Sequence, residues 1–280
     1  MIYKVIPDFD IAKIADSGQC FRMNPLPSGG YSVIAFGRYL EVRDLGGGRH
    51  SFSCTEEEFD TIWADYFDLD SDYNAIASMI PPDDRFLRAA LAYGHGMRLL
   101  RQDPWEIMVS FILSQRKNIP AIKASVEALC SRYGEEAAWN QITYRSFPTA
   151  ERLTGIGCED LRTCSLGYRD KYVAEAARQF EAGQIRFDEL KSAGFDAAKA
   201  SLKGMYGIGD KVADCILLFG LGYKNAFPED TWIKKILEKE YAGHFPKERY
   251  DGHLGMVQQY MFYYARSAGY TAVAPLNSCD

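Results

Sequence analysis

Apolar and polar residues alternate along the first fifty-odd positions of the chain. The runs YSVIAF (31–36) and RYLEVRD (38–44) are rich in β-branched and aromatic residues and are separated by Gly37. A glycine-rich break at 46–49 follows, and HSFSC (50–54) resumes the alternation. Short alternating runs bounded by turn residues are typical of β-strands. The first part of the chain therefore predicts an antiparallel β-sheet.

Helical periodicity replaces this alternation at Thr55. Thr55 and Glu58 have the spacing of a capping box, which predicts a helix from this point to about residue 66. The breaker PPDD (81–84) precedes a further helix in FLRAALAYG (86–94). Everything beyond predicts short helices only. Their expected ranges are 104–115, 118–133, 168–181, 195–204, 210–220, 230–241 and 252–267.

These patterns predict an α+β protein with two parts. Residues 1–100 are expected to form the antiparallel β-sheet domain with flanking helices, and residues 101–280 a mainly α-helical domain. The last helix of the second part is expected to return and line a pocket.

Charge is distributed unevenly between the two parts. The net charge of −6 argues against binding polyanions through bulk charge alone. Residues 1–100, however, hold nine Lys and Arg against fifteen Asp and Glu, whereas residues 101–280 hold twenty-three of each. The second part can therefore keep a local basic face while the first carries the excess acid.

Several classes of protein can be set aside. No run approaches the ~20 apolar residues that span a bilayer, and the start MIYKVIPDFDIAK lacks the apolar stretch of a secretory signal. We therefore expect no membrane association and a cytoplasmic protein. The seven cysteines are scattered without zinc-ligand spacing, and only Cys279 follows Asp230, which excludes a four-cysteine cluster there. We expect free thiols, no metal and no cofactor.

The most informative stretch is LKGMYGIGDKVADCILLFGLGYKNAFPEDTWIKK (202–235), which predicts helix, tight turn, helix, loop and helix. Gly207 and Gly209 permit positive backbone dihedral angles and close approach to a ligand. The helix that follows presents free N–H groups, which favour a phosphate. Lys211 lies in its first turn, and Asp230 lies at the mouth of the next helix. An amine, a carboxylate and a phosphate site together suggest an enzyme acting on a nucleic acid.

These motifs resemble those of a known family. GIGDK (207–211) and FPEDT (227–231) resemble the hairpin and acid loop of the helix-hairpin-helix DNA glycosylases. SGQCFR (17–22), SLGYRDKYV (165–173), KVADC (211–215) and GMVQQYMF (255–262) further resemble segments of 8-oxoguanine DNA glycosylases of the eukaryotic-like type. The motifs occur in the family's order and extend over nearly the whole chain.

Residue spacing predicts a base pocket in such an enzyme. Lys211 and Cys215 lie four apart on one helix, as do Gln258 and Phe262 on another, so each pair shares a helix face. Two such faces can enclose a planar purine. The ring of Phe262 would stack on the base, Cys215 would face its other side, and Gln258 would bind its Watson–Crick edge. The resemblance implies that Gly18 offers its carbonyl to N7–H, a proton that only the oxidised base carries.

The resemblance also implies a mechanism and a substrate. Lys211 attacks C1′ as an uncharged amine, forms a Schiff base and permits β-elimination, while Asp230 stabilises the cationic sugar. Tyr168 is the implied wedge beside the flipped nucleotide, and Arg169 the contact to the opposite base. The implied partner is double-stranded DNA containing oxidised guanine, bound by a monomer that is nucleoid-associated if prokaryotic.

The chain departs from the family at three positions. Arg116 stands where the eukaryotic members have an asparagine, and Ala121 where an arginine reads the cytosine opposite the lesion. The side chain of Ala121 cannot hydrogen-bond a base, so we expect weaker discrimination for cytosine. Trp232 replaces a phosphate-contacting histidine, which leaves that contact open.

The residues alone leave other interpretations open. A glycosylase of the same fold for another damaged base is one, and a non-catalytic module that grips phosphates with its hairpin is another. Taken singly, Lys211 is compatible with a surface lysine, Asp230 with a simple helix cap, and Cys215 and Phe262 with core residues. The motif LTGIG (153–157) imitates a second hairpin, but no lysine follows it, so we interpret it as a turn.

Overall fold

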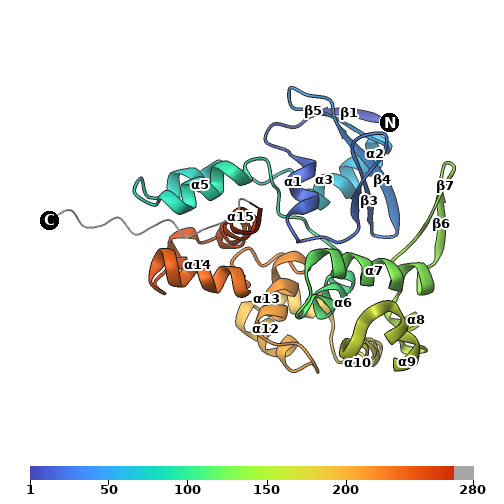
Figure 1. Ribbon diagram of the computed structural model, residues 1–280. Coiled ribbons are helices and arrows are strands. Elements are labelled where there is room, and N and C mark those ends of the chain that lie inside the picture. The colour runs from blue at the N-terminus through green and yellow to red at the C-terminus, as the bar shows by residue number, and fades with distance from the viewer. Residues whose placement is uncertain (268–280) are drawn as a thin grey trace.

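The computed structural model describes residues 1–267, and a five-stranded antiparallel sheet forms its N-terminal part (Figure 1). The strand order is β1-β5-β4-β3-β2. The strands are β1 (Ile2–Val5), β2 (Met23–Pro25), β3 (Tyr31–Ala35), β4 (Arg38–Asp44) and β5 (Arg49–Phe52). The three strands expected from the alternation are β3, β4 and β5. β1 and β2 lie outside the three alternating runs and were not expected from the sequence.

A two-residue turn joins β3 to β4. Ala35 pairs with Arg38, and the turn residues Phe36 and Gly37 have φ of 52° and 72°. Both angles are positive, as hairpin turns that match the right-handed twist of strands require. Glycine adopts such angles without strain, which explains its place between the two runs.

The capping box predicted at Thr55 is confirmed. The Thr55 side chain accepts the N–H of Glu58, and the Glu58 carboxylate accepts the N–H of Thr55. The helix that it starts comprises α2 (Glu56–Glu58), a π-helical turn (Phe59–Trp63) and α3 (Ala64–Tyr66). Its end at residue 66 is the predicted one.

Helices make up most of the remaining chain, and the α+β prediction is confirmed. Within residues 1–267 the other α-helices are α1 (Ile11–Asp16), α4 (Ala75–Met79), α5 (Arg85–Gly94), α6 (Pro104–Ser114), α7 (Ile119–Tyr133), α8 (Ala150–Thr154), α9 (Cys158–Leu161), α10 (Asp170–Glu181), α11 (Phe187–Ser192), α12 (Phe195–Lys203), α13 (Asp210–Phe219), α14 (Thr231–Tyr241) and α15 (Leu254–Ser267). All seven ranges expected beyond residue 100 correspond to helices, with ends displaced by two residues at most. None of these helices is long and apolar enough to cross a bilayer.

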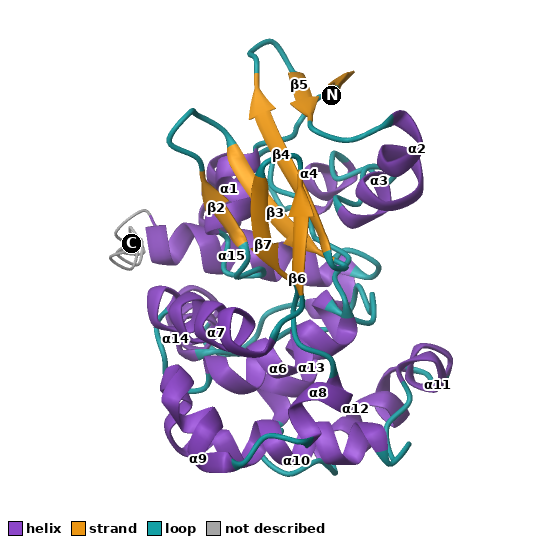
Figure 2. Ribbon diagram, turned by 90° about the vertical axis from the view of Figure 1, so that its right-hand side faces the viewer, coloured by secondary structure: helices purple, strands orange, loops and turns teal. Residues whose placement is uncertain are grey.

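The expectation of helices only beyond residue 100 is wrong at one place. β6 (Glu136–Trp139) and β7 (Ile142–Arg145) form a two-stranded hairpin that reaches from the helical part to the sheet (Figure 2). The ring of Tyr39 on β4 lies 5.3 Å from that of Trp139 and 5.6 Å from that of Tyr144. This aromatic contact joins the two parts of the molecule on the side of β4.

The last helix returns to the N-terminal part, as Figure 1 shows for α15 and α5. Gly94 on α5 permits close packing, because a Cβ there would lie 2.4 Å from the ring of Tyr260. The rings of Tyr93 and Tyr263 lie 5.3 Å apart across the same interface. The α5–α15 interface therefore crosses the division expected at residue 100, which stays a prediction.

Candidate active site

The hairpin before α13 is built from two glycines with different conformations. Gly207 has φ of +87°, and a Cβ on it would lie 2.4 Å from Cγ of Tyr172, so glycine is required. Gly209 caps α13 with φ of −97°, which any residue adopts, and nothing lies within 4 Å of where its Cβ would be. Of the two glycines that permit a positive φ, only Gly207 therefore adopts one. Its glycine leaves open space at the start of the helix.

That helix start is free to bind an anion. No side chain caps α13, and within residues 1–267 no acceptor meets the N–H of Lys211 or Val212. Free N–H groups at a helix N-terminus attract negative charge. The phosphate site predicted from the sequence therefore has two unpaired backbone donors.

Lys211 lies against α6. Its Nζ is 3.3 Å from Oγ of Ser114 and 4.9 Å from the ring centroid of Phe111. Neither contact could be found from the sequence, because α6 is buried on all sides and shows no polar face. The lysine thus combines an apolar neighbour with one hydroxyl, and no acid lies within ion-pair distance of it in the described residues.

Asp230 lies at the N-cap of α14 and faces the same space. Its Oδ1 accepts the N–H of Trp232 at 3.0 Å and of Ile233 at 2.9 Å. Burial raises the pKa of this carboxyl, while the two N–H donors and the charge of Lys211 oppose that shift. Asp230 therefore serves as a helix cap and also lies within electrostatic range of the lysine.

Both residues line one groove of about 880 Å³. Its opposite wall is the loop after α6 together with α7 and Phe262. Arg116 lines this wall, is exposed and has a positive φ of 53°. Trp232 on α14 also lines the groove, whereas Ala121 does not.

A smaller pocket of about 50 Å³ opens beside Lys211 and Asp230. The residues predicted to hold the base all line it: Gly18, Cys215, Gln258 and Phe262. Sequence reasoning missed four further lining residues, Phe111, Phe219, Pro228 and Gln259. The pocket joins the groove at Gly18, Phe111, Lys211, Asp230 and Phe262, which line both.

Gly18 forms the wall of this pocket with its backbone. Its φ is +80°, and a Cβ would lie 2.9 Å from Cδ1 of Ile119 and 3.1 Å from Cε1 of Phe262. In the described part of the chain no N–H donates to the Gly18 carbonyl. Glycine is therefore required at this position, and its carbonyl is available to a ligand.

The remaining pocket groups differ in how free they are. Burial raises the pKa of the Cys215 thiol to about 11, so the thiol is protonated at neutral pH. Nε2 of Gln258 donates to the Pro228 carbonyl at 3.1 Å, and its Oε1 accepts from Gln259 at 2.9 Å. The Gln258 amide must rearrange or share these bonds to bind a base.

Tyr168 and Arg169 are neighbours with opposite exposure. Tyr168 is 49% exposed and Arg169 only 6%. Nε of Arg169 donates to the Gln115 carbonyl at 2.8 Å and Nη1 to that of Leu166 at 3.1 Å, and Nη2 also donates to Gln115. Three of the five N–H groups of a guanidinium are thus used. Only two remain for an opposite base.

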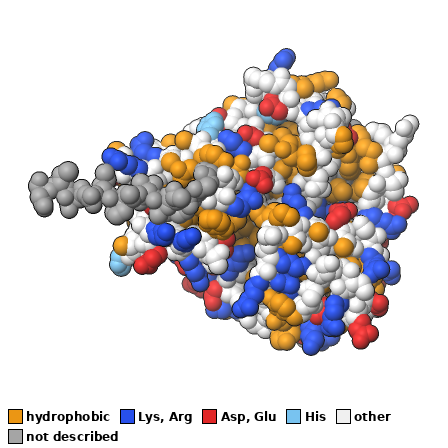
Figure 3. Space-filling view, in the orientation of Figure 1, with side chains coloured by type: hydrophobic (Ala, Val, Ile, Leu, Met, Phe, Trp, Pro, Cys, Tyr) orange, Lys and Arg blue, Asp and Glu red, His pale blue; other side chains and the backbone are white. Residues whose placement is uncertain are grey.

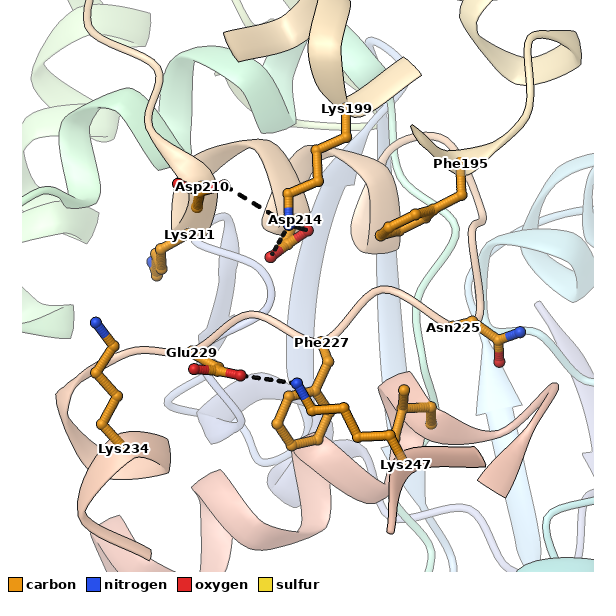
Figure 4. Close-up of a pocket in the computed structure, with 11 residues that line it drawn as sticks. Phe195, Lys199, Asp210, Lys211, Asp214, Asn225, Phe227, Glu229, Lys234 and Lys247 are labelled. Atoms are coloured by element: carbon orange, nitrogen blue, oxygen red, sulfur yellow. Dashed lines mark hydrogen bonds and ion pairs between the residues drawn. The ribbon is translucent and has the colours of Figure 1, made fainter. Parts of the chain in front are cut away.

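A second cleft of about 410 Å³ lies on the other side of the α13 start (Figure 4). Lys199 pairs with Asp214 at 2.7 Å, and Lys247 with Glu229 at 2.8 Å. Lys211 and Lys234 line both the cleft and the groove. On the face that Figure 3 shows, Lys and Arg side chains gather over the helical part with acidic ones among them. Within residues 1–267 no cluster of three His, Cys, Asp or Glu side chains could hold a metal ion.

Comparison with known proteins agrees with this geometry. Residues 2–108 match the family model described as 8-oxoguanine DNA glycosylase, N-terminal domain, and residues 109–249 match that of the HhH-GPD superfamily of base excision DNA repair proteins. A probable N-glycosylase/DNA lyase of Methanothermobacter thermautotrophicus is 30% identical over 232 residues, which are 72% of this chain and 73% of the relative.

A yeast and a bacterial relative extend this comparison. The Saccharomyces cerevisiae N-glycosylase/DNA lyase is 34% identical over 174 residues, 58% of this chain but only 46% of the yeast protein. A crystal structure of the Clostridium acetobutylicum 8-oxoguanine glycosylase/lyase, in complex with DNA containing cytosine opposite 8-oxoG, has a TM-score of 0.88 and 33% identity. That comparison covers 96% of this chain and 99% of the other.

Proposed function

Since the chain belongs to the 8-oxoguanine DNA glycosylases of the HhH-GPD base excision repair superfamily, we propose that it excises 8-oxoguanine from duplex DNA and then cleaves the strand at the abasic site. The observation that carries this proposal is that the wide groove and the small pocket meet at the same two residues. Lys211 and Asp230 line both the wide groove and the small pocket that Gly18, Cys215, Gln258 and Phe262 complete. A base held in the pocket leaves its sugar beside the amine and the carboxylate.

Recognition rests on the backbone of Gly18. The oxidised base carries a proton on N7, which the free Gly18 carbonyl can accept, whereas guanine presents a lone pair there and is repelled. Losing such a hydrogen bond in a buried site costs roughly 1–3 kcal/mol. The base reaches the pocket by leaving the stack.

Excision follows from the position of Lys211. Its uncharged amine attacks C1′, the bond from C1′ to the base breaks, and the base leaves with the bonding electrons and takes up a proton. Positive charge develops on the sugar during this step, and the ionised Asp230 stabilises it. Loss of the ring oxygen from C1′ then leaves an imine between Lys211 and the opened sugar.

Strand cleavage uses the same imine. It acidifies the proton on C2′, a base removes that proton, and the C3′–O bond breaks with the phosphate as leaving group. Water then hydrolyses the imine and releases Lys211. No group other than the amine needs to change between the two reactions, so one residue accounts for both activities.

The groove fits the DNA that this chemistry requires. The unpaired N–H groups of the α13 start bind a phosphate of the damaged strand, and the exposed ring of Tyr168 fills the gap that the flipped base leaves. Arg169 offers its two remaining N–H groups to the opposite base. A monomer that works on chromosomal DNA in the cytoplasm is part of the same proposal, and size-exclusion chromatography with and without duplex tests the monomer.

The proposal is tested with one duplex that carries a single 8-oxoguanine. We expect strand cleavage at the lesion and, in the presence of borohydride, a covalent protein–DNA adduct. Matched duplexes with an alkylated purine or an oxidised pyrimidine separate this substrate from those of other glycosylases. Equal or faster cutting of one of these duplexes would contradict the assignment, and the absence of any adduct would leave only DNA binding.

A further inference from the structure

The turn that carries Gly18 is held in place by two buried glutamine side chains. Gln19 is 0% exposed and Gln102 is 8% exposed. Neither lines the groove or the small pocket. Burying an amide costs free energy unless its hydrogen bonds are satisfied. The hydrogen bonds of these two buried amides therefore show what they hold in place next to Gly18.

Both polar atoms of the Gln19 side chain form hydrogen bonds to other parts of the chain. Its Nε2 donates to Oγ of Ser17 at 2.9 Å and to the Arg98 carbonyl at 2.8 Å. Its Oε1 accepts the N–H of Leu100 at 2.7 Å. The same side chain thus ties the residue before Gly18 to the extended segment between α5 and α6. A carboxylate lacks the two donors and an apolar side chain lacks all three groups, so only an amide of this length makes these bonds.

Gln102 continues the connection to the helix of the nucleophile. Its Nε2 donates to the Gln19 carbonyl at 2.8 Å, and its backbone N–H donates to the carbonyl of Phe219 at 3.0 Å. Phe219 is the last residue of α13, and Lys211 lies in the first turn of that helix. Gln102 is therefore a direct link between the Gly18 turn and the lysine helix.

The two links leave the Gly18 carbonyl little freedom. The Gln19 side chain holds Ser17, the residue before Gly18, and Gln102 holds the carbonyl of Gln19, the residue after it. The φ of +80° at Gly18 is accessible because it is glycine, and glycine also has the most freedom to rotate away. Something outside the turn must therefore fix the direction in which the carbonyl points.

We propose that Gln19 and Gln102 are positioning residues that aim the Gly18 carbonyl into the base pocket and set its place relative to Lys211. The inference rests on the proposed function, because it concerns recognition of the damaged base. It assigns these residues to excision alone. An abasic site has no base for Gly18 to contact, so strand cleavage at a preformed abasic site does not depend on the two amides.

The test compares two substrates with the same protein. Gln19→Met and Gln102→Met keep the side-chain length and remove the hydrogen bonds. We expect excision of 8-oxoguanine to fall about tenfold in each variant, because the hydrogen bond between the Gly18 carbonyl and N7–H of the base is lost when the carbonyl is no longer held in place. Cleavage and borohydride trapping of a duplex with a preformed abasic site should stay within about twofold of the unmodified protein. Gln179→Met is the matched control, since its amide bonds only Glu175 on α10, outside the groove.

The possible outcomes separate the claims. A parallel fall of both reactions, or no change in either, overturns the positioning role. If the methionine variants do not fold, Gln102→Glu decides: a protonated carboxyl can donate to the Gln19 carbonyl and a carboxylate cannot. The ratio of excision to abasic cleavage, relative to the unmodified protein, should then rise as the pH falls, and a flat ratio overturns the role. An unmodified protein that cuts the abasic duplex but not the 8-oxoguanine duplex contradicts the proposed function itself.

Discussion

The groove and the cleft of Figure 4 lie on either side of the α13 start and share lining residues, but their charged side chains are paired to different extents. In the cleft of Figure 4 the acids are neutralised at close range, with Lys199 on Asp214 and Lys247 on Glu229. In the groove, Lys211 has no acid within ion-pair distance among the described residues, and Asp230 accepts hydrogen bonds from backbone N–H groups. Ion pairs that are closed within the protein serve the fold. Charges that the protein leaves open are available to a substrate.

The largest effect is expected from removing the amine of Lys211, which has no ion-pair partner in the described residues. Lys211→Gln keeps the length of the side chain but cannot form an imine. Excision and abasic cleavage should both fall by roughly 10⁴-fold or more, as when a covalent nucleophile is lost. Single-turnover assays on the two duplexes measure this, with DNA affinity as the control for folding. Abasic cleavage that survives in the variant would show that another amine performs it.

The second-largest loss of excision is expected from removing the carboxylate of Asp230. Asp230→Asn keeps the cap of α14 but removes the charge, so excision should fall roughly 10²- to 10³-fold. The raised pKa of Asp230 means that its folded-state stability contribution is largest at low pH and is lost as the pH rises through that pKa. At neutral pH the asparagine variant should therefore be at least as stable. Thermal unfolding checks this, and a clear loss of stability would show that the charge of Asp230 stabilises the fold.

Breaking an ion pair in the cleft of Figure 4 should instead reduce stability and leave excision nearly unchanged. In Lys199→Met, the carboxylate of Asp214 stays 8% exposed without its partner. Burial already raises the pKa of Asp214 against the influence of Lys199. We expect a loss of about 2 kcal/mol in the free energy of unfolding, between the values for surface and buried pairs, with excision nearly unchanged. Lys203→Met is the control, because its pair with Asp210 is exposed. A large loss of excision at unchanged stability would place this cleft in the chemistry.

The departures at the groove wall predict a shallow opposite-base preference. Ala121 uses its N–H on Asn118 and does not line the groove, and Arg169 has few donors left. A bidentate base contact is worth ~1–3 kcal/mol, so its absence should keep the excision rates opposite the four bases within about tenfold. Four duplexes that differ only in that base measure this. A steep cytosine preference would be contrary to the expectation, and Ala121→Arg should steepen it.

The smallest effect concerns a lysine that both clefts share. Lys234 is exposed and is not part of any ion pair found in the described residues. If it meets a phosphate, Lys234→Gln should reduce the slope of log affinity against log salt by about one. Lys239→Gln on the same helix is the control. Equal slopes in the two variants would remove Lys234 from the DNA contact.

The sequence predicted the parts of the fold that depend on local signals. The Thr55 capping box and the α13 and α14 ranges follow from residues close in sequence. The β6–β7 hairpin does not, because EAAW (136–139) has a composition that suits a helix and becomes a strand by packing against Tyr39. Tertiary contacts of this kind override local propensity.

In the site too, residues close in sequence were predicted and contacts between distant segments were not. Spacing on one helix placed Cys215 beside Lys211 and Phe262 beside Gln258, and all four line one pocket. Contacts between distant segments were missed, such as Ser114 on Lys211 and Pro228 on Gln258. The burial of Arg169 was missed as well, since a sequence does not show which carbonyls will surround a guanidinium.

The docking of α15 on α5 has a consequence for the newly made chain. The ribosome releases Gly18 early and the helix with Gln258 and Phe262 about 240 residues later. Until α15 packs against α5, Gly18 and Lys211 lack the part of the pocket wall that Gln258 and Phe262 supply. We therefore expect a product that ends before this helix to have no complete base pocket and to lack excision activity.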